Sequence, residues 1–247
     1  MIAPIVVGGV VVVGAAGLAA FHAGPALAGV SPIGYRLTPK LVGRGRAGHV
    51  ALTFDDGPDP ASTPAILSAL DDLGWKATFF MLGTKARLAP GLVGEIAAAG
   101  HEIAVHGDEH LNVLRRRPQA VRDDIERALD TLTDLSGAVP MWFRPPFGIL
   151  SGTALRKAKQ VGLRTVLWTA WGRDWRKEAT PESIRDDVVK RYLDGGTILL
   201  HDTDGESYQD SWRNTLGSLP LISQEITTRG LTVGPLRDHG ISSEKNV

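Results

Sequence analysis

The chain has 247 residues, and its 27 Lys and Arg side chains balance its 27 Asp and Glu side chains. This length suits one large domain or two small ones, and the missing basic surplus argues against a nucleic-acid partner. With no cysteine, disulfides, thiol nucleophiles and thiolate metal sites are excluded, so a metal ion would need histidine and carboxylate ligands.

The chain begins with an apolar segment, because residues 1–21 carry no charge and the first charged residue is Arg36. About 20 apolar residues in a helix span a bilayer, so residues 1–28 are predicted to form an N-terminal apolar helix that anchors the chain in the membrane. A cleaved signal segment is the alternative, with Ala26-Leu27-Ala28 as its cleavage site, and a buried core segment is a weaker one. Basic residues follow the segment and favour a cytoplasmic position for the rest of the chain: Arg36, Lys40, Arg44 and Arg46. The substrate inferred below instead favours a domain outside the cytoplasm, membrane-anchored or secreted, and this conflict stays open.

Glycine and proline punctuate residues 29–47, which are predicted to be a linker. Short apolar runs then alternate with longer amphipathic segments. The predicted strands are His49–Phe54, Ala77–Leu82, Glu102–Val105, Met141–Phe143, Arg164–Trp168, Thr197–Leu200 and Leu231–Val233. The predicted helices are Thr63–Leu73, Pro90–Ala99, Pro118–Leu135, Thr153–Val161, Pro181–Leu193 and Arg213–Arg229.

This alternation predicts an α/β domain over residues 48–240 with a mostly parallel sheet, followed by a flexible tail at 241–247. From the pattern alone, a (β/α) barrel and a doubly wound sheet are both compatible with these elements.

Reactive side chains follow one predicted strand after another. The segments after the strands are Asp55-Asp56-Gly57-Pro58, His106-Gly107-Asp108-Glu109-His110, Arg144-Pro145-Pro146-Phe147, Gly172-Arg173-Asp174-Trp175 and His201-Asp202. Each segment alone is a weak signal of function. Because the carboxyl ends of parallel strands meet at one face, however, the five together indicate one active site.

Asp56, His106 and His110 form a set of two histidines and one carboxylate. Three protein ligands leave coordination positions open for water and substrate, which is typical of a catalytic metal site. The set suits one divalent ion, with Zn²⁺ expected first and Co²⁺, Ni²⁺ or Fe²⁺ also compatible.

The remaining residues supply acid–base chemistry. Asp55 is a candidate general base for water, and His201 is a candidate general acid for a leaving amine or alcohol. Arg144 would keep Asp55 ionised, and Asp174 would orient His201. A backbone N–H near Phe147 would donate to a developing oxyanion. Together these groups predict metal-assisted hydrolysis of an amide or ester.

Five motifs carry a resemblance to a known family: Thr53-Phe54-Asp55-Asp56-Gly57-Pro58, His106-x-x-x-His110, Arg144-Pro145-Pro146-Phe147, Asp174-Trp175 and Leu199-Leu200-His201. In order and spacing they resemble the motifs of polysaccharide deacetylases, the NodB-homology domain of family 4 carbohydrate esterases. The resemblance covers roughly residues 48–238. It implies a distorted (β/α) barrel of about seven parallel strands that removes N-acetyl groups from a sugar polymer with the help of a divalent metal.

Carried over by position, the resemblance implies the roles already assigned to the acid, the base, the ligands and their supporting groups. It adds Leu199 and Trp175 as walls of an acetyl pocket, with Phe147 beside them. Several residues depart from the family pattern: Phe147 replaces the commoner tyrosine, and Asp108 and Glu109 put two acids between the ligand histidines. Gly107 stands where a serine or threonine is usual, which is expected to loosen the ligand loop, and Trp171 stands where many members have an acid.

The expected substrate is therefore an N-acetylated glycan, either peptidoglycan or a chitin-like polymer. Acetylxylan, a lipid-linked sugar or a small cyclic amide would use the same chemistry, and a catalytically weak carbohydrate-binding relative is the alternative from another class. The apolar leader makes the membrane a further expected partner, and no protein partner follows from the sequence.

Overall fold

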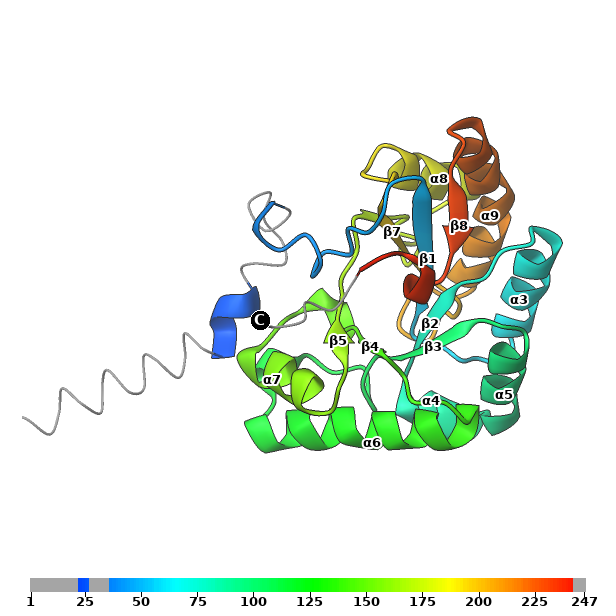
Figure 1. The fold of residues 1–247 in the computed structure, drawn as a ribbon. Coiled ribbons are helices and arrows are strands. Elements are labelled where there is room, and N and C mark those ends of the chain that lie inside the picture. Colours follow the sequence, from blue (N-terminus) through cyan, green and yellow to red (C-terminus); the bar gives the residue numbers. More distant parts are fainter. Residues whose placement is uncertain (1–21, 27–35, 242–247) are drawn as a thin grey trace, which may run out of the picture.

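Strand β1 (His49–Asp55) lies at the centre of a parallel sheet in the computed structural model, which describes residues 22–26 and 36–241 (Figure 1). The other strands are β2 (Thr78–Met81), β3 (Glu102–Val105), β4 (Trp142–Phe143), β5 (Arg164–Thr165), β6 (Ala170–Trp171), β7 (Thr197–His201) and β8 (Thr232–Gly234). Their order is β5-β4-β3-β2-β1-β7-β6, with β8 also paired to β1, and every pairing is parallel. The predicted α/β barrel of about seven parallel strands is confirmed. The apolar helix predicted to precede it lies outside the described residues.

Helices surround the outer face of this sheet (Figure 1). They are α3 (Thr63–Asp72), α4 (Gly83–Leu88), α5 (Pro90–Ala98), α6 (Pro118–Ser136), α7 (Gly152–Gln160), α8 (Pro181–Val189) and α9 (Ser211–Thr228). Proline occupies the first turn of α3, α5, α6 and α8, where its missing N–H would have no helical partner. A capping box between Thr180 and Ser183 starts α8. The six-residue α4 was not predicted, because a helix this short shows little periodicity.

The alternation of side chains along β1 decides which residues reach the interior of the barrel. Val50, Leu52 and Phe54 belong to the large apolar cluster shared with the surrounding helices. Ala51 belongs to a second cluster together with Phe80, Ala104, Trp142, Val166, Leu236 and Ile241. Thr53 and Asp55 follow Ala51 at intervals of two, so they face the same interior side.

The strand predicted over Arg164–Trp168 is wrong in its extent, because two short strands, β5 and β6, stand on either side of residues 166–169. In this gap the carbonyl oxygens of Val166 and Leu167 accept hydrogen bonds from the Arg144 side chain, at 3.4 and 2.8 Å. Strand pairing is therefore interrupted where the backbone carbonyls accept hydrogen bonds from the buried Arg144 guanidinium.

Part of the predicted linker packs on the barrel. Val42 is buried, the Leu41 carbonyl accepts the Leu167 N–H at 2.7 Å, and the Gly43 carbonyl accepts the Thr197 hydroxyl at 2.7 Å. In the part of the chain that the structure describes, no helix combines the length and apolarity needed to cross a membrane. The anchor predicted at residues 1–28 falls mostly outside that part and stays a prediction.

Two buried histidines join the ends of the domain. His49 Nδ1 lies 2.8 Å from His239 Nδ1, and His239 Nε2–H donates to the Gly43 carbonyl at 3.2 Å. The carbonyl only accepts, so neutral His239 must present an unprotonated Nδ1 to the Nδ1–H of His49. A proton added to His239 would set two N–H groups against each other. Burial lowers the pKa of His239 to about 4 and also lowers the pKa of His49.

The pair predicts a loss of stability in mild acid. In the unfolded chain the His239 side chain takes up a proton near pH 6.5, whereas in the folded chain it does so only near pH 4. Its contribution to stability is therefore complete above pH 6.5 and is lost as the pH falls below it. Between pH 7 and pH 5 we expect a loss of about 2 kcal/mol from His239, at about 1.36 kcal/mol per pKa unit. This loss is measured by urea unfolding of the wild type and of His239→Gln at pH 7 and pH 5, with a chelator present in every sample.

The variant should be less stable at pH 7 but lose less stability on acidification. The partly exposed His22 offers a control, since His22→Gln should follow the wild type. An identical pH dependence in the wild type and in His239→Gln would contradict the prediction.

Candidate active site

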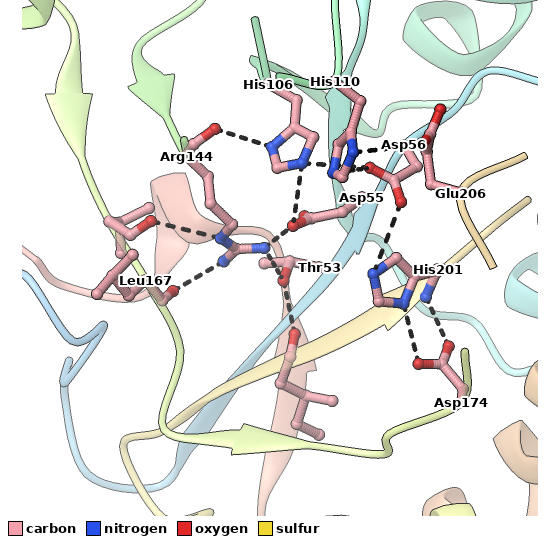
Figure 2. A network of polar contacts seen from close by, with 12 residues as sticks. Thr53, Asp55, Asp56, His106, His110, Arg144, Leu167, Asp174, His201 and Glu206 are labelled. Carbon is pink, nitrogen blue, oxygen red and sulfur yellow. Dashed lines mark hydrogen bonds and ion pairs between the residues drawn. The ribbon is translucent and has the colours of Figure 1, made fainter. Parts of the chain in front are cut away.

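A cleft of about 670 Å³ opens at the carboxyl ends of the strands. Its polar lining includes Asp55 from the end of β1, His106 and His110 after β3, and His201 from the end of β7. Figure 2 shows these side chains pointing toward one another from β1, from β7 and from the segment after β3. The structure therefore brings together the acid–base and ligand residues that the sequence placed at strand ends.

Asp55 and Asp56 are adjacent in sequence but face different partners. Asp56 has a φ of 76°, a conformation rare for residues other than glycine, and it directs its carboxylate toward the histidines. The following Gly57 must lack a side chain, because a Cβ there would lie 2.3 Å from Asp202 Oδ2. Because of this tight turn, the carboxylates of Asp55 and Asp56 point in different directions and can take different roles.

Asp55 pairs with Arg144 inside the barrel. Arg144 is fully buried, and its guanidinium donates to Asp55 Oδ1 at 2.6 Å and to Thr53 Oγ1 at 2.8 Å. Further donation to the Leu167 carbonyl satisfies the other side of the guanidinium. Hydrogen bonds between a charged guanidinium and a carboxylate are stronger than neutral ones, so Arg144 fixes the position of the Asp55 carboxylate. Asp55 Oδ2 faces the other way, 3.8 Å from His106 Nε2.

The three candidate metal ligands converge on one point. Asp56 Oδ1 lies 3.2 Å from His106 Nε2 and 3.4 Å from His110 Nε2, and the ligand atoms of the three residues all lie within 4.8 Å of one another. His106 Nδ1–H donates to the Arg144 carbonyl at 2.8 Å, which leaves the Nε2 lone pair free to bind a cation.

These residues fit a divalent cation. Asp56 Oδ1 is buried and accepts no hydrogen bond from the described residues, which is a costly state unless a ligand satisfies it. Burial acts to raise the pKa of Asp56, but the neighbouring histidines, among them His201, outweigh it and hold the pKa well below its usual range. Burial lowers the pKa of His110 to about 4, so this imidazole is neutral at pH 7, as a ligand must be.

His201 is held on the opposite side of the cleft by Asp174. Its Nδ1–H donates to Asp174 Oδ1 at 2.9 Å, and its backbone N–H donates to Asp174 Oδ2 at 2.7 Å. Nε2 points into the cleft, 3.8 Å from Asp56 Oδ2 (Figure 2). Burial acts to lower the pKa of His201, but the Asp174 carboxylate, with Asp56 and Asp55, raises it to about 10.

Comparison with known proteins agrees with this arrangement. The sequence model of the polysaccharide deacetylase family matches residues 43–166. The chain is 37% identical over 185 residues to a peptidoglycan-N-acetylglucosamine deacetylase of Bacillus cereus, covering 73% of this chain and 83% of the relative. The chain belongs to the polysaccharide deacetylase family. The predicted class of enzyme, a hydrolase of the polysaccharide deacetylase type, is thereby confirmed.

Two further comparisons describe the breadth of this family. A chitooligosaccharide deacetylase of Bradyrhizobium is 32% identical over 194 residues, covering 76% of this chain and 88% of the relative. A solved peptidoglycan N-acetylglucosamine deacetylase superposes with a TM-score of 0.78 at 30% identity, covering 87% of this chain and all of that one.

Aromatic residues form the walls of the cleft in this family member. The apolar lining consists of Phe147, Gly148, Leu167, Trp168, Trp171, Trp175 and Leu199. Phe147 is 59% exposed, and its ring centroid lies 4.3 Å from that of His110. Trp175 meets His201 edge to face, with ring centroids 5.5 Å apart. Trp171, which stands where many family members have an acid, lies under the Arg191 guanidinium, 3.3 Å from the ring centroid. Exposed and half-buried aromatic rings of this kind suit the apolar faces of sugars.

Sequence reasoning missed three supporting residues. Thr53 accepts from Arg144, and Thr215 on α9 donates to Asp174 Oδ2 at 2.8 Å. Glu206 carries no assigned chemistry from the sequence, yet its Oε2 lies 3.4 Å from His110 Nδ1. Thr53 is signalled by its place two residues before Asp55 on the same strand face, whereas Thr215 and Glu206 have no comparable pattern.

Proposed function

We propose that the chain removes N-acetyl groups from an N-acetylated polysaccharide of the peptidoglycan or chitin type. The observation that carries the proposal is the grouping of Asp56, His106 and His110 between two buried charge pairs, Asp55–Arg144 and His201–Asp174. Relatives named for peptidoglycan and chitooligosaccharides support the substrate class.

Asp56, His106 and His110 would hold one divalent cation, with Zn²⁺ the first candidate for a set of nitrogen and oxygen ligands. When bound, such an ion supplies polarisation of the acetyl carbonyl and a lower pKa for its water ligand.

Asp55 is the proposed general base. Its Oδ1 is held by Arg144 and its Oδ2 faces the ligand histidines, so it can accept a proton from the attacking water. Arg144 holds the carboxylate in place through its hydrogen bond to Oδ1. The backbone N–H of Phe147 is the proposed donor to the oxyanion that forms on the acetyl carbonyl.

His201 is the proposed general acid. Asp174 bonds its Nδ1, which leaves Nε2–H as the group that faces the substrate. Donation of this proton to the sugar nitrogen lets the amine leave and gives acetate and a free amino sugar. Trp175 and Leu199 would enclose the acetyl methyl group beside it.

Peptidoglycan or chitin lies outside the cytoplasm, so the proposal includes an envelope location, with residues 1–28 as anchor or signal segment. The basic residues after that segment still favour the opposite orientation. A reporter enzyme fused after Val247 tests the location independently of activity.

Acetate release is expected to depend on one bound metal ion. The zinc-loaded chain should release acetate from peptidoglycan or chitin oligomers, a chelator should abolish release, and Zn²⁺ should restore it. His106→Ala should bind no stoichiometric metal and regain no activity, because Asp56 and His110 alone give too few ligands. Elemental analysis measures the bound metal, and an assay with peptidoglycan, chitin oligomers and acetylxylan measures the released acetate.

Full activity after exhaustive chelation would refute the metal assignment. Binding of glycans by the metal-loaded chain without acetate release would favour the carbohydrate-binding alternative.

A further inference from the structure

The loop that joins the two candidate ligand histidines is held by a carboxylate from a neighbouring helix. Asp124 on α6 accepts the backbone N–H of Asp108 with Oδ2 at 3.0 Å and the backbone N–H of Glu109 with Oδ1 at 3.2 Å. One side chain thus binds two of the three amides between His106 and His110. Hydrogen bonds from N–H groups to a charged acceptor are stronger than neutral ones.

The same loop is held from other sides as well. Asp108 is buried, and its carboxylate accepts from Arg87 at 2.7 and 3.1 Å and from Arg127 at 3.2 Å. Its backbone carbonyl accepts from Thr84, through the N–H at 3.0 Å and the hydroxyl at 2.8 Å. The loop therefore has partners on α4 and α6, although Gly107 offers no hydroxyl of its own.

Gly107 and Asp124 depend on each other. Gly107 has a φ of 105°, in the region that favours glycine, and a Cβ there would lie 2.8 Å from Asp124 Oδ2. A side chain at position 107 would therefore displace the carboxylate from the amides. The bare backbone at Gly107 is what allows Asp124 to approach.

We infer that Asp124 is a positioning residue for the metal site. By fixing the amides of Asp108 and Glu109, it holds His106 and His110 where both Nε2 atoms approach Asp56 Oδ1, at 3.2 and 3.4 Å. The inference rests on the proposed metal site, but its readout requires no substrate.

Competition between the chain and a chelator for Zn²⁺ tests the inference. Asp124→Ala should raise the zinc Kd about tenfold or more, the range found for groups that orient metal ligands. Asp124→Asn should fall between the wild type and the alanine variant, because its oxygen can accept from one amide while its NH2 group, a donor, faces the other. Activity of Asp124→Ala should recover as zinc is raised to saturation, because the variant keeps every reacting group.

Two neighbouring acids provide controls. Asp123→Ala removes a carboxylate that bonds Gln119 on the same helix, and Glu109→Gln removes a charge between the ligand histidines. Both should keep the wild-type zinc Kd. Circular dichroism and unfolding of each metal-free variant establish that zinc is measured on folded protein.

A zinc Kd for folded Asp124→Ala equal to that of Asp123→Ala would overturn the inference. So would an equal weakening in Glu109→Gln, because charge alone would then explain the effect. If Asp124→Ala weakens zinc binding but the wild type releases no acetate from any glycan, the positioning role stands and the proposed function fails.

Discussion

Asparagine in place of Asp55 is expected to slow acetate release by about 10²–10⁴-fold at saturating zinc, the usual contribution of a general base. The zinc Kd should stay close to that of the wild type, because Asp55 is not among the three grouped ligands. The amide oxygen of asparagine can still accept from Arg144, so the substitution removes mainly the basic oxygen. Loss of turnover with retention of zinc in Asp55→Asn would distinguish a general base from a metal ligand.

The experiment needs a check on folding, since Arg144 is fully buried and would lose its countercharge. Breaking a buried ion pair commonly costs about 3–5 kcal/mol, although the retained acceptor should reduce this. Activity and zinc binding are therefore measured well below the unfolding midpoint of the variant. Asp56→Asn serves as the matched comparison, because it should lose zinc as well as activity. Unchanged turnover in Asp55→Asn would end the assignment of the base.

His201→Gln is expected to slow the deacetylation of N-acetyl sugars by about 10²–10⁴-fold, again with zinc binding retained. The reason is that a sugar amine leaves poorly unless its nitrogen is protonated, and His201 Nε2–H is the proposed donor. An aryl acetate has a leaving group that departs without a proton. The loss in His201→Gln should therefore be much smaller with an aryl acetate than with an N-acetyl sugar.

The two variants together separate acid from base. Asp55→Asn should be impaired on both substrates, because both require an activated water. If His201→Gln is equally slow on the aryl acetate and on the sugar, His201 does not act by protonating the leaving group.

Much of the fold was predictable from the sequence because the starts of helices and the positions of strands are marked by local sequence signals. Prolines mark the starts of α3, α5, α6 and α8, and short apolar runs mark β1, β2, β3 and β7. The reactive residues follow directly on such strands, so their convergence follows from the parallel topology. Sequence alone thus predicted which residues share a site, while their roles still await the experiments above.

Only the tertiary structure decided what supports those residues. The interruption between β5 and β6 depends on Arg144, which lies 20 residues earlier than the start of β5 and takes the carbonyls of Val166 and Leu167. Asp174 accepts a hydrogen bond from Thr215 on α9, and Asp124 on α6 binds the loop after His106.

Gly107 illustrates the difference. From sequence, its missing hydroxyl predicts a looser loop, but the structure supplies a carboxylate that needs that glycine in order to approach. The sequence by itself determined the parallel α/β architecture and the strand-end residues, because apolar runs, turn chemistry and motif spacing are local properties. The partners of those residues were decided by the packing of α6 and α9 on the barrel, since hydrogen bonds between distant segments leave no periodic trace in a single sequence.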